Sequence, residues 1–384
     1  MMRKRKTALL HNSSYFTNFK EVNYQTPMSE FDEYIRQGEP GKKEKAAAWQ
    51  TAIGLQDVDG LKPSKYLIET AKKHIEGDIT IGDVKSMLDG YYKSKTARVE
   101  VESERTEEAD KVSARITELL EEETFAFTPG ELVRIHRRLF QGLFKFAGSF
   151  RTYNISKKEW VLNDASVLYN PFENIAETLE YDFSEEKKYD YISASSDDSI
   201  RHIASFIAGL WQIHPFGEGN TRTTAVFLIK YLRSFGFHID NEVFNSHSWY
   251  FRNALVRANY SNREKGISPD YSFLVAFLRN LILGENNELK NRYLHVDYLK
   301  SNSFQSAESG DSKSKNCTLN CTLEELAVLK FLLDNPKATQ KQVALHIRRS
   351  ERTAKKLTVK LQQDGLLERK NGRRDGYWEV KVQL

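Results

Sequence analysis

The stretch His214-Pro-Phe-Gly-Glu-Gly-Asn-Thr-Arg222 decides how this sequence folds and what it can bind. It joins two apolar segments with helical periodicity, which we expect to form helices over about 197–212 and 221–235. Pro215 cannot continue the first helix, and the two glycines let the backbone N–H groups of the turn point inward. Such a turn at a helix N-terminus is typical of anion sites, with phosphate as the natural ligand.

The side chains of this turn suit a nucleotide phosphate. Arg222 can make a forked contact to phosphate oxygens, and Asn220 can donate a hydrogen bond to them. Glu218 offers a hard oxygen ligand for a Mg²⁺ ion that also binds phosphates. His214 titrates near neutral pH and can take a proton from an incoming hydroxyl, while Phe216 anchors the loop in the core. The turn therefore predicts chemistry on a nucleotide.

These nine residues resemble the signature of the Fic family, His-x-Phe-x-(Asp/Glu)-Gly-Asn-Gly-Arg, with a second Arg three residues later. The likeness extends to Leu132-Val-Arg-Ile-His-Arg-Arg-Leu-Phe140 and to Phe146-Ala-Gly-Ser-Phe-Arg-Thr152, and covers about 125–285. It implies a mainly α fold, namely a Fic-type helical core with a β-hairpin flap. It also implies transfer of AMP from Mg·ATP to a Ser, Thr or Tyr hydroxyl of a protein target, this protein itself included.

By this resemblance His214 is the general base and Glu218 the Mg²⁺ ligand. The residues that the resemblance assigns to nucleotide binding are Phe216, Gly217, Gly219, Asn220, Thr221, Arg222, Tyr250 and Asn259, with the last two on the adenine side. A strand-turn-strand pattern at 152–163 predicts the flap, which would clamp the target segment by strand addition. Its expected contact residues are Ile155, Trp160, Val161 and Leu162.

Two positions depart from the family pattern. Thr221 replaces the usual Gly, and a Lys at this position accompanies phosphorylation in the related Doc toxins. Ala225 stands where the second Arg is expected, which removes a cation from the γ-phosphate end of ATP. The alternatives to AMP transfer are therefore a Doc-like phosphotransferase that uses ATP, and a nucleotide-sensing DNA-binding regulator without catalysis.

The segment 42–93 resembles the antitoxin-like modules that inhibit Fic proteins through a glutamate. Asp59 stands where that glutamate would be, and Glu100 is a second candidate. Because the inhibitory Glu and its Arg partner are both replaced, we expect inhibition by this module to be weak or differently built.

The rest of the chain divides by composition and periodicity. We expect a polar N-terminal arm (1–41), the antitoxin-like helical module (42–93), the Fic domain (94–290), a Ser- and Asn-rich linker (291–320) and a C-terminal domain (321–384). Three helical segments and two strand-like runs joined by Asn371-Gly372 predict a small winged helix at the C-terminal end.

The C-terminal end is basic. Between Lys337 and Arg374 there are twelve Lys or Arg and three acidic residues, a net +9, so the rest of the chain carries −5 of the total +4. The residues predicted to contact DNA are Arg352, Lys355, Lys356 and Lys360. A structural or protein-docking role for this charged face is the alternative.

Composition narrows the cellular setting. No apolar run approaches the ~20 residues that span a bilayer, and the apolar part of the N-terminus is too short for a secretory signal. The two cysteines, Cys317 and Cys321, lack the partners of a zinc site, so free thiols in a reducing cytoplasm are expected. The predicted partners are a protein target, DNA and a second copy of the chain, with ATP and Mg²⁺ as cofactors.

Overall fold

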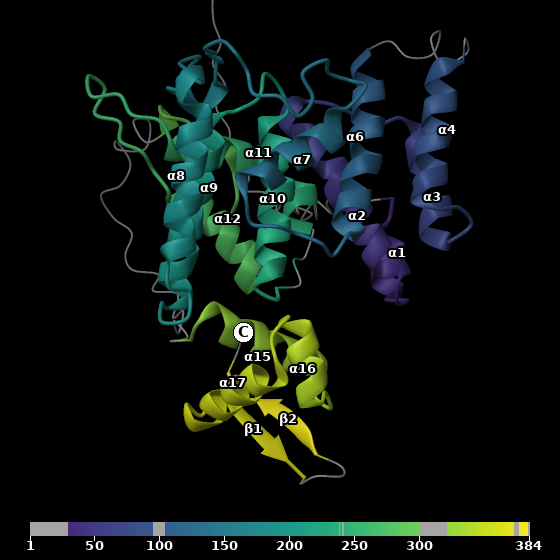
Figure 1. Cartoon of the computed structure of the whole chain (residues 1–384), viewed down its shortest axis with the longest axis vertical. Coiled ribbons are helices and arrows are strands. Elements are labelled where there is room, and N and C mark those ends of the chain that lie inside the picture. The colour runs from purple at the N-terminus through teal and green to yellow at the C-terminus, as the bar shows by residue number, and fades with distance from the viewer. Residues whose placement is uncertain are drawn as a thin grey trace, which may run out of the picture.

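A computed structural model of the chain describes residues 30–94, 104–237, 239, 242–298, 321–371 and 376–382. This part is mainly helical, as expected, and the described residues contain two strands, both near the C-terminus. Figure 1 shows a broad upper layer of packed helices with a small unit of helices and strands below it. No helix in the described ranges combines the length and the apolar character that crossing a bilayer requires.

The N-terminal module is a group of short helices around its own small core. Its elements are α1 (Asp32–Gln37), α2 (Lys42–Gly54), the 3₁₀ helix η1 (Leu55–Asp59), α3 (Lys65–Glu76) and α4 (Ile81–Lys93). Thr80 and Asp83 form the predicted capping box of α4. Trp49 is fully buried, and its indole N–H donates to His74 Nδ1 at 3.1 Å. Helix α2 packs on the next layer through Ala52, so the module is continuous with the main core.

The central layer contains the helices that carry the quoted loop. They are α6 (Glu104–Glu121), α7 (Pro129–Phe140), η2 (Trp160–Leu162), η3 (Phe172–Asn174), α8 (Ile175–Lys188), α9 (Ser196–Ile213), α10 (Asn220–Ser234), α11 (Glu242–Ala258), α12 (Ser272–Leu283) and α13 (Asn291–Leu294). Thr128 caps α7, with Pro129 in the first turn. Almost all of α10 is buried from Asn220 to Leu232. The predicted helices at 197–212 and 221–235 are thus confirmed within one or two residues.

The predicted flap is not a strand pair. Residues 152–163 form an irregular loop that ends in the 3₁₀ turn η2. The chain does reverse, since the Glu159 N–H donates to the Ala165 carbonyl at 3.0 Å and the Lys157 N–H to Ser166 Oγ at 3.1 Å. Burial of Val161 in the core bends the chain before a ladder can form. The prediction of a β-hairpin here was therefore wrong, whereas the reversal is present.

The C-terminal unit has the element order expected of a winged helix. It consists of α15 (Leu323–Asp334), α16 (Gln340–His346), α17 (Glu351–Gln363), β1 (Leu367–Lys370) and β2 (Tyr377–Val380). The two strands pair antiparallel, with Arg369 opposite Trp378. The linker beyond residue 298 lies outside the described residues.

Several contacts fix the C-terminal unit to the central layer. Lys330 Nζ donates to the Ile282 carbonyl at 2.6 Å, and the Ser196 N–H donates to the Cys321 carbonyl at 2.8 Å. Arg348 donates to the Glu123 carbonyl just beyond the end of α6. Cys321 is buried and forms no disulfide with a described residue, and Cys317 lies outside the described residues.

Candidate active site

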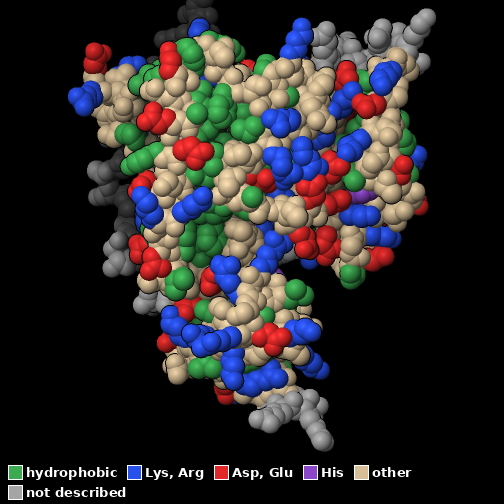
Figure 2. All heavy atoms as spheres, in the orientation of Figure 1, with side chains coloured by type: hydrophobic (Ala, Val, Ile, Leu, Met, Phe, Trp, Pro, Cys, Tyr) green, Lys and Arg blue, Asp and Glu red, His purple; other side chains and the backbone are tan. Residues whose placement is uncertain are grey.

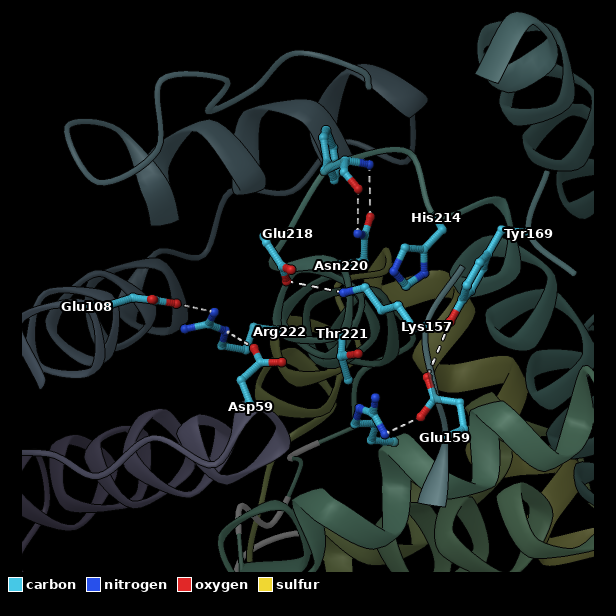
Figure 3. A network of polar contacts seen from close by, with 12 residues as sticks. Asp59, Glu108, Lys157, Glu159, Tyr169, His214, Glu218, Asn220, Thr221 and Arg222 are labelled. Carbon is cyan, nitrogen blue, oxygen red and sulfur yellow. Dashed lines mark hydrogen bonds and ion pairs between the residues drawn. The ribbon is translucent and has the colours of Figure 1, made fainter. Parts of the chain in front are cut away.

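The loop between α9 and α10 holds the predicted residues in one tight turn. His214 ends α9 in the left-handed region at φ 50°, and Gly219 precedes α10 at φ 78°. A Cβ on Gly219 would lie 2.3 Å from the Phe140 ring, so only glycine fits between this ring and the turn. The N-terminus of α10 therefore opens directly beside His214, as the anion-binding prediction requires (Figure 3).

Asn220 closes this loop. Its side-chain oxygen accepts from the Phe216 N–H at 3.0 Å, and its amide donates to the Phe216 carbonyl at 2.8 Å. We expected this amide to bind phosphate directly. The structure instead places it on the loop backbone, where it fixes the shape of the turn. Phe216 is fully buried, which fits its expected role as the anchor of the loop.

His214 is a neutral base in a buried setting. Its side chain packs against Tyr169 with ring centroids 4.2 Å apart, and its Nδ1 lies 3.2 Å from the Trp211 carbonyl. A carbonyl can only accept, so Nδ1 carries the hydrogen and Nε2 presents its lone pair. Nε2 is buried and has no hydrogen-bond partner among the described residues. Burial, with the nearby charge of Lys157, holds the pKa of His214 well below its usual range.

His136, on α7, supports the loop and was not predicted from the sequence. Its ring stacks on Phe216 with centroids 3.7 Å apart and an interplanar angle of 6°. Nδ1 accepts from the Gly148 N–H at 2.9 Å, so Nε2 carries the hydrogen and donates to the Glu218 carbonyl at 3.0 Å. Burial lowers the pKa of His136 to about 4, which keeps the ring neutral.

Arg151 holds the other side of the loop. Its guanidinium donates to the carbonyls of His214 at 2.8 Å and Tyr153 at 2.7 Å, and its backbone N–H donates to the Pro215 carbonyl at 2.9 Å. Both supporting residues lie in the two upstream stretches that resembled the family. Each stretch contains several polar residues, so nothing in the sequence alone singles out His136 or Arg151.

Arg222 is turned toward the N-terminal module. Its side chain is 1% exposed, and its Nε lies 2.9 Å from Asp59 Oδ2. The guanidinium also contacts Glu108 Oε1 at 2.5 Å and Gln56 Oε1 at 3.1 Å. The sequence pointed to Asp59 but not to Gln56 or Glu108, because nothing local marks either as a partner of a distant arginine. Glu100, the other inhibitory candidate, lies outside the described residues.

Two further ion pairs close the site. Lys157 Nζ, from the flap segment 152–163, lies 3.2 Å from Glu218 Oε2. Glu159, also from this segment, is fully buried and pairs with Arg252 NH1 at 2.7 Å (Figure 3). Burial raises the pKa of Glu159. Neither Lys157 nor Arg252 was predicted from the sequence to be a site residue.

These three ion pairs surround a very small cavity. Its lining consists of Asp59, Lys157, Glu159, Trp211, His214, Glu218, Gly219, Asn220, Thr221 and Arg252. The cavity measures about 10 Å³, room for about one water molecule. Thr221 contributes its hydroxyl, which accepts from the Trp211 indole N–H at 3.0 Å. The site is thus assembled in a closed state, because a nucleotide pocket needs several hundred Å³.

Other predicted site residues lie away from this cavity. Tyr250 is buried and stacks toward Phe277, and Asn259 donates to the Ala208 and Leu255 carbonyls, which ties the end of α11 to α9. Both residues contribute to helix packing. Neither lines the cavity in this closed state, so the predicted adenine contact is not seen here. Gly217 faces the flap segment, where an added Cβ would lie 2.9 Å from the Tyr153 hydroxyl.

The expected flap residues divide into two groups. Val161 and Leu162 are buried in the core, so neither can clamp a target by its side chain as predicted. Trp160 is 49% exposed and packs edge-on against His295. Ile155 is half-buried and lines a surface groove of about 370 Å³ together with residues from 166 to 171.

Comparison with known proteins identifies the family. The sequence profile described as "Fic/DOC family" matches residues 126–232. A probable protein adenylyltransferase (y4lH) from Sinorhizobium fredii is 30% identical over 151 residues, 38% of this chain and 69% of that protein. The protein adenylyltransferase VbhT from Bartonella schoenbuchensis is 27% identical over 114 residues, 30% of this chain. This match spans only 23% of VbhT.

A solved structure of a Fic family protein from Desulfovibrio desulfuricans covers 92% of this chain and 94% of its own length, at 12% identity and a TM-score of 0.41. The family match at residues 126–232 includes the loop described above and the helices α7, α9 and α10 that hold it. The chain belongs to the Fic/DOC family.

Proposed function

We propose that this protein transfers AMP from Mg·ATP to a Ser, Thr or Tyr hydroxyl of a protein target, with His214 as the general base. The observation that supports this most directly is the state of His214. It is buried and neutral, its Nδ1–H is held by the Trp211 carbonyl, and its Nε2 lone pair has no partner in the described structure. The name protein adenylyltransferase, carried by both curated relatives, agrees with this reaction.

The proposed step moves one proton and one AMP group. Nε2 of His214 takes the proton of the target hydroxyl as its oxygen attacks the α-phosphorus of ATP. The new P–O bond forms while the bond from the α-phosphorus to the bridging oxygen breaks, and pyrophosphate leaves with the electron pair. The Trp211 carbonyl, which accepts from Nδ1–H, stabilises the imidazolium that results.

The loop backbone would bind the phosphates. The N–H groups at the start of α10 are oriented by the Asn220–Phe216 bonds and by the glycine at 219, so they need no reorganisation when charge develops. His136 and Arg151 act through the loop, as positioning residues that hold its carbonyl groups.

Glu218 would hold the Mg²⁺ ion. Its half-exposed carboxylate stands at the anion-binding turn, and Mg²⁺ prefers one or two carboxylates together with waters and substrate phosphates. The described residues contain no group of three His, Cys, Asp or Glu that could hold a metal ion. When bound, Mg²⁺ would neutralise negative charge on the nucleotide phosphates.

We further propose that Asp59 restrains the enzyme. The contacts of Arg222 to Asp59 and Gln56 of the N-terminal module, and to Glu108 of α6, hold the guanidinium where it cannot fork onto phosphate. This agrees with the expectation of a differently built inhibition, because an aspartate pairs with the motif arginine itself.

The test of AMP transfer uses the purified full chain with Mg²⁺ and ATP labelled at the α or the γ phosphate. We expect label from the α position, but not from the γ position, to be retained on protein, and we expect His214→Ala to abolish it. Retention from the γ position alone would replace the proposal with the Doc-like phosphotransferase. No retention by the wild-type chain or by Asp59→Asn, with a cell lysate present as a source of targets, would favour the non-catalytic regulator.

A second candidate function is DNA binding by the C-terminal unit. Arg352, Lys355 and Lys356 are exposed on one helix, α17, and Figure 2 shows Lys and Arg side chains gathered over this unit. Lys360, the fourth predicted contact, pairs with Glu325 at 2.6 Å and is therefore the weakest of the four predictions. Three exposed cations on a helix support phosphate contacts with DNA.

A further inference from the structure

We propose that Lys157, in the flap segment, is a ligand for the polyphosphate of the bound nucleotide. It would supply the positive charge that Ala225 cannot, since position 225 is fully buried in α10 and carries no cation. This inference rests on the proposed function for the identity of the ligand, a nucleoside triphosphate, but not on which of its phosphates is transferred.

The cations around the cavity differ in how firmly they are held. Arg222 is 1% exposed and is bound by two carboxylates and an amide. Arg252 is 14% exposed and pairs with the fully buried Glu159. Lys157 and Glu218 are 28% and 52% exposed, so theirs is the pair most screened by water and the easiest to exchange. Lys157 is therefore the cation that an entering anion can recruit first.

The position of Lys157 also fits a phosphate contact. Its Nζ lies 3.2 Å from Glu218 Oε2, the carboxylate that would bind Mg²⁺. If Glu218 held Mg²⁺, its carboxylate would no longer pair with the Lys157 ammonium. An unpaired ammonium is unfavourable in a partly desolvated site. A phosphate oxygen of the nucleotide could replace the Glu218 carboxylate as the partner of Lys157. Lys157 and His214 line the same small cavity, which places the ammonium near the proposed general base.

Lys158 provides a matched control. It is the next residue of the same segment and carries the same charge, but its side chain is exposed and does not line the cavity. Removing either lysine changes the net charge and the flap segment equally. Only Lys157 should matter to a ligand inside the site.

The experiment measures equilibrium binding of ATP and of AMP to the full chain by calorimetry, for wild type, Lys157→Met and Lys158→Met. We expect Lys157→Met to weaken ATP binding about tenfold or more, the usual worth of a charge-assisted hydrogen bond, and AMP binding far less. Lys158→Met should stay within about twofold for both. The loss for ATP should persist when Mg²⁺ is replaced by EDTA, because an ammonium contacts phosphate without a metal.

Other outcomes overturn the inference. Equal affinities for Lys157→Met and Lys158→Met would show that the ammonium does not touch the polyphosphate. Tighter ATP binding by Lys157→Met, seen only with Mg²⁺, would show that the lysine merely competes with the metal for Glu218. A wild-type chain that binds ATP through Lys157 yet transfers no AMP would refute the proposed function alone. A chain, including its Asp59→Asn variant, that binds no ATP would refute both.

Discussion

Asp59 Oδ2 and Arg222 Nε lie 2.9 Å apart and join the end of η1 to the first turn of α10. The guanidinium is almost completely buried and lies over the Phe140 ring, 4.9 Å from its centroid. The motif arginine is therefore enclosed by the N-terminal module on one side and by α7 on the other. In the function we propose, a triphosphate could contact this arginine only after the contacts to Asp59, Gln56 and Glu108 are broken.

Replacing Asp59 should release part of this restraint. In Asp59→Asn, Arg222 keeps Glu108 but loses one of its two carboxylates, so we expect AMP transfer to rise about tenfold. Unfolding stability should fall by about 1–3 kcal/mol, because the buried arginine is then less well paired. Labelled-nucleotide transfer and denaturant unfolding measure the two effects.

Asp57→Asn is the control for this change. Asp57 lies in the same 3₁₀ helix with its side chain exposed, and it does not line the cavity. We expect its activity to match that of the wild type. An Asp59→Asn chain that is no more active than Asp57→Asn would argue against the inhibitory role.

The pH dependence of transfer should reflect the lowered pKa of His214. A general base works in its unprotonated form, and an ordinary histidine would be half protonated near pH 6.5. Because burial keeps the pKa of His214 well below 6.5, the rate should stay level as the pH falls through 6.5 and drop only in more acidic solution.

The lowered pKa of His214 should also make folding stability depend on pH. The unfolded histidine binds a proton more readily than the folded one, so folding stability is lost as the pH falls below about 6.5. Single-turnover rates across this range check the catalytic prediction, and thermal unfolding checks the second. A rate that halves near pH 6.5 while the protein remains folded would contradict a buried neutral base.

Comparing alanine substitutions at two glycines should distinguish the cost of backbone strain from the cost of a steric clash. Gly219 and Gly77 both have positive φ, 78° and 89°, but only Gly219 has a neighbour where a Cβ would stand. We expect Gly77→Ala to cost about 1 kcal/mol and Gly219→Ala about 2–4 kcal/mol, since the Phe140 ring must also move. Chemical unfolding measures both values. Equal losses would mean that the loop can move away from Phe140 at little cost.

DNA binding by the C-terminal unit should depend on salt and on α17. Changing Arg352, Lys355 and Lys356 together to Gln should weaken binding and lower the slope of log affinity against log salt by about 2 to 3. Fluorescence anisotropy with a random duplex measures this.

The control for DNA binding changes three exposed lysines of the N-terminal module, Lys62, Lys65 and Lys73, to Gln. It removes the same charge and should leave the slope unchanged. If both triple variants bind alike, the charge of α17 has no special part in binding.

Much of the fold could be predicted because the signals are local. The apolar periodicity of α4, α9 and α10 and the capping box of α4 located these helices. The tight turn expected at Asn371-Gly372 was wrong, because Lys370 pairs with Tyr377 and six residues therefore connect the two strands. The flap was also mispredicted. Apolar residues on both sides of a polar turn favoured strands at 152–163, but Val161 and Leu162 are both buried in the core, and two adjacent buried side chains do not fit the period of a strand.

The site was predictable where its residues share one loop. His214, Glu218 and Gly219 line the cavity as expected, whereas Lys157, Glu159 and Arg252 reach it from other elements. Such tertiary partners leave no mark in a local pattern. Asn220 shows a second limit, because its residue type suits both a phosphate and a backbone carbonyl, and only the folded loop distinguishes them.

The closed cavity has a consequence for finding inhibitors. A compound that binds through Arg222 must first displace carboxylates that the chain already supplies at high effective concentration. Such a compound should therefore bind the wild-type protein more weakly than Asp59→Asn, in which one of these carboxylates is removed. For such a compound, the difference in binding free energy between the wild type and Asp59→Asn would measure the cost of displacing the Asp59 carboxylate from Arg222.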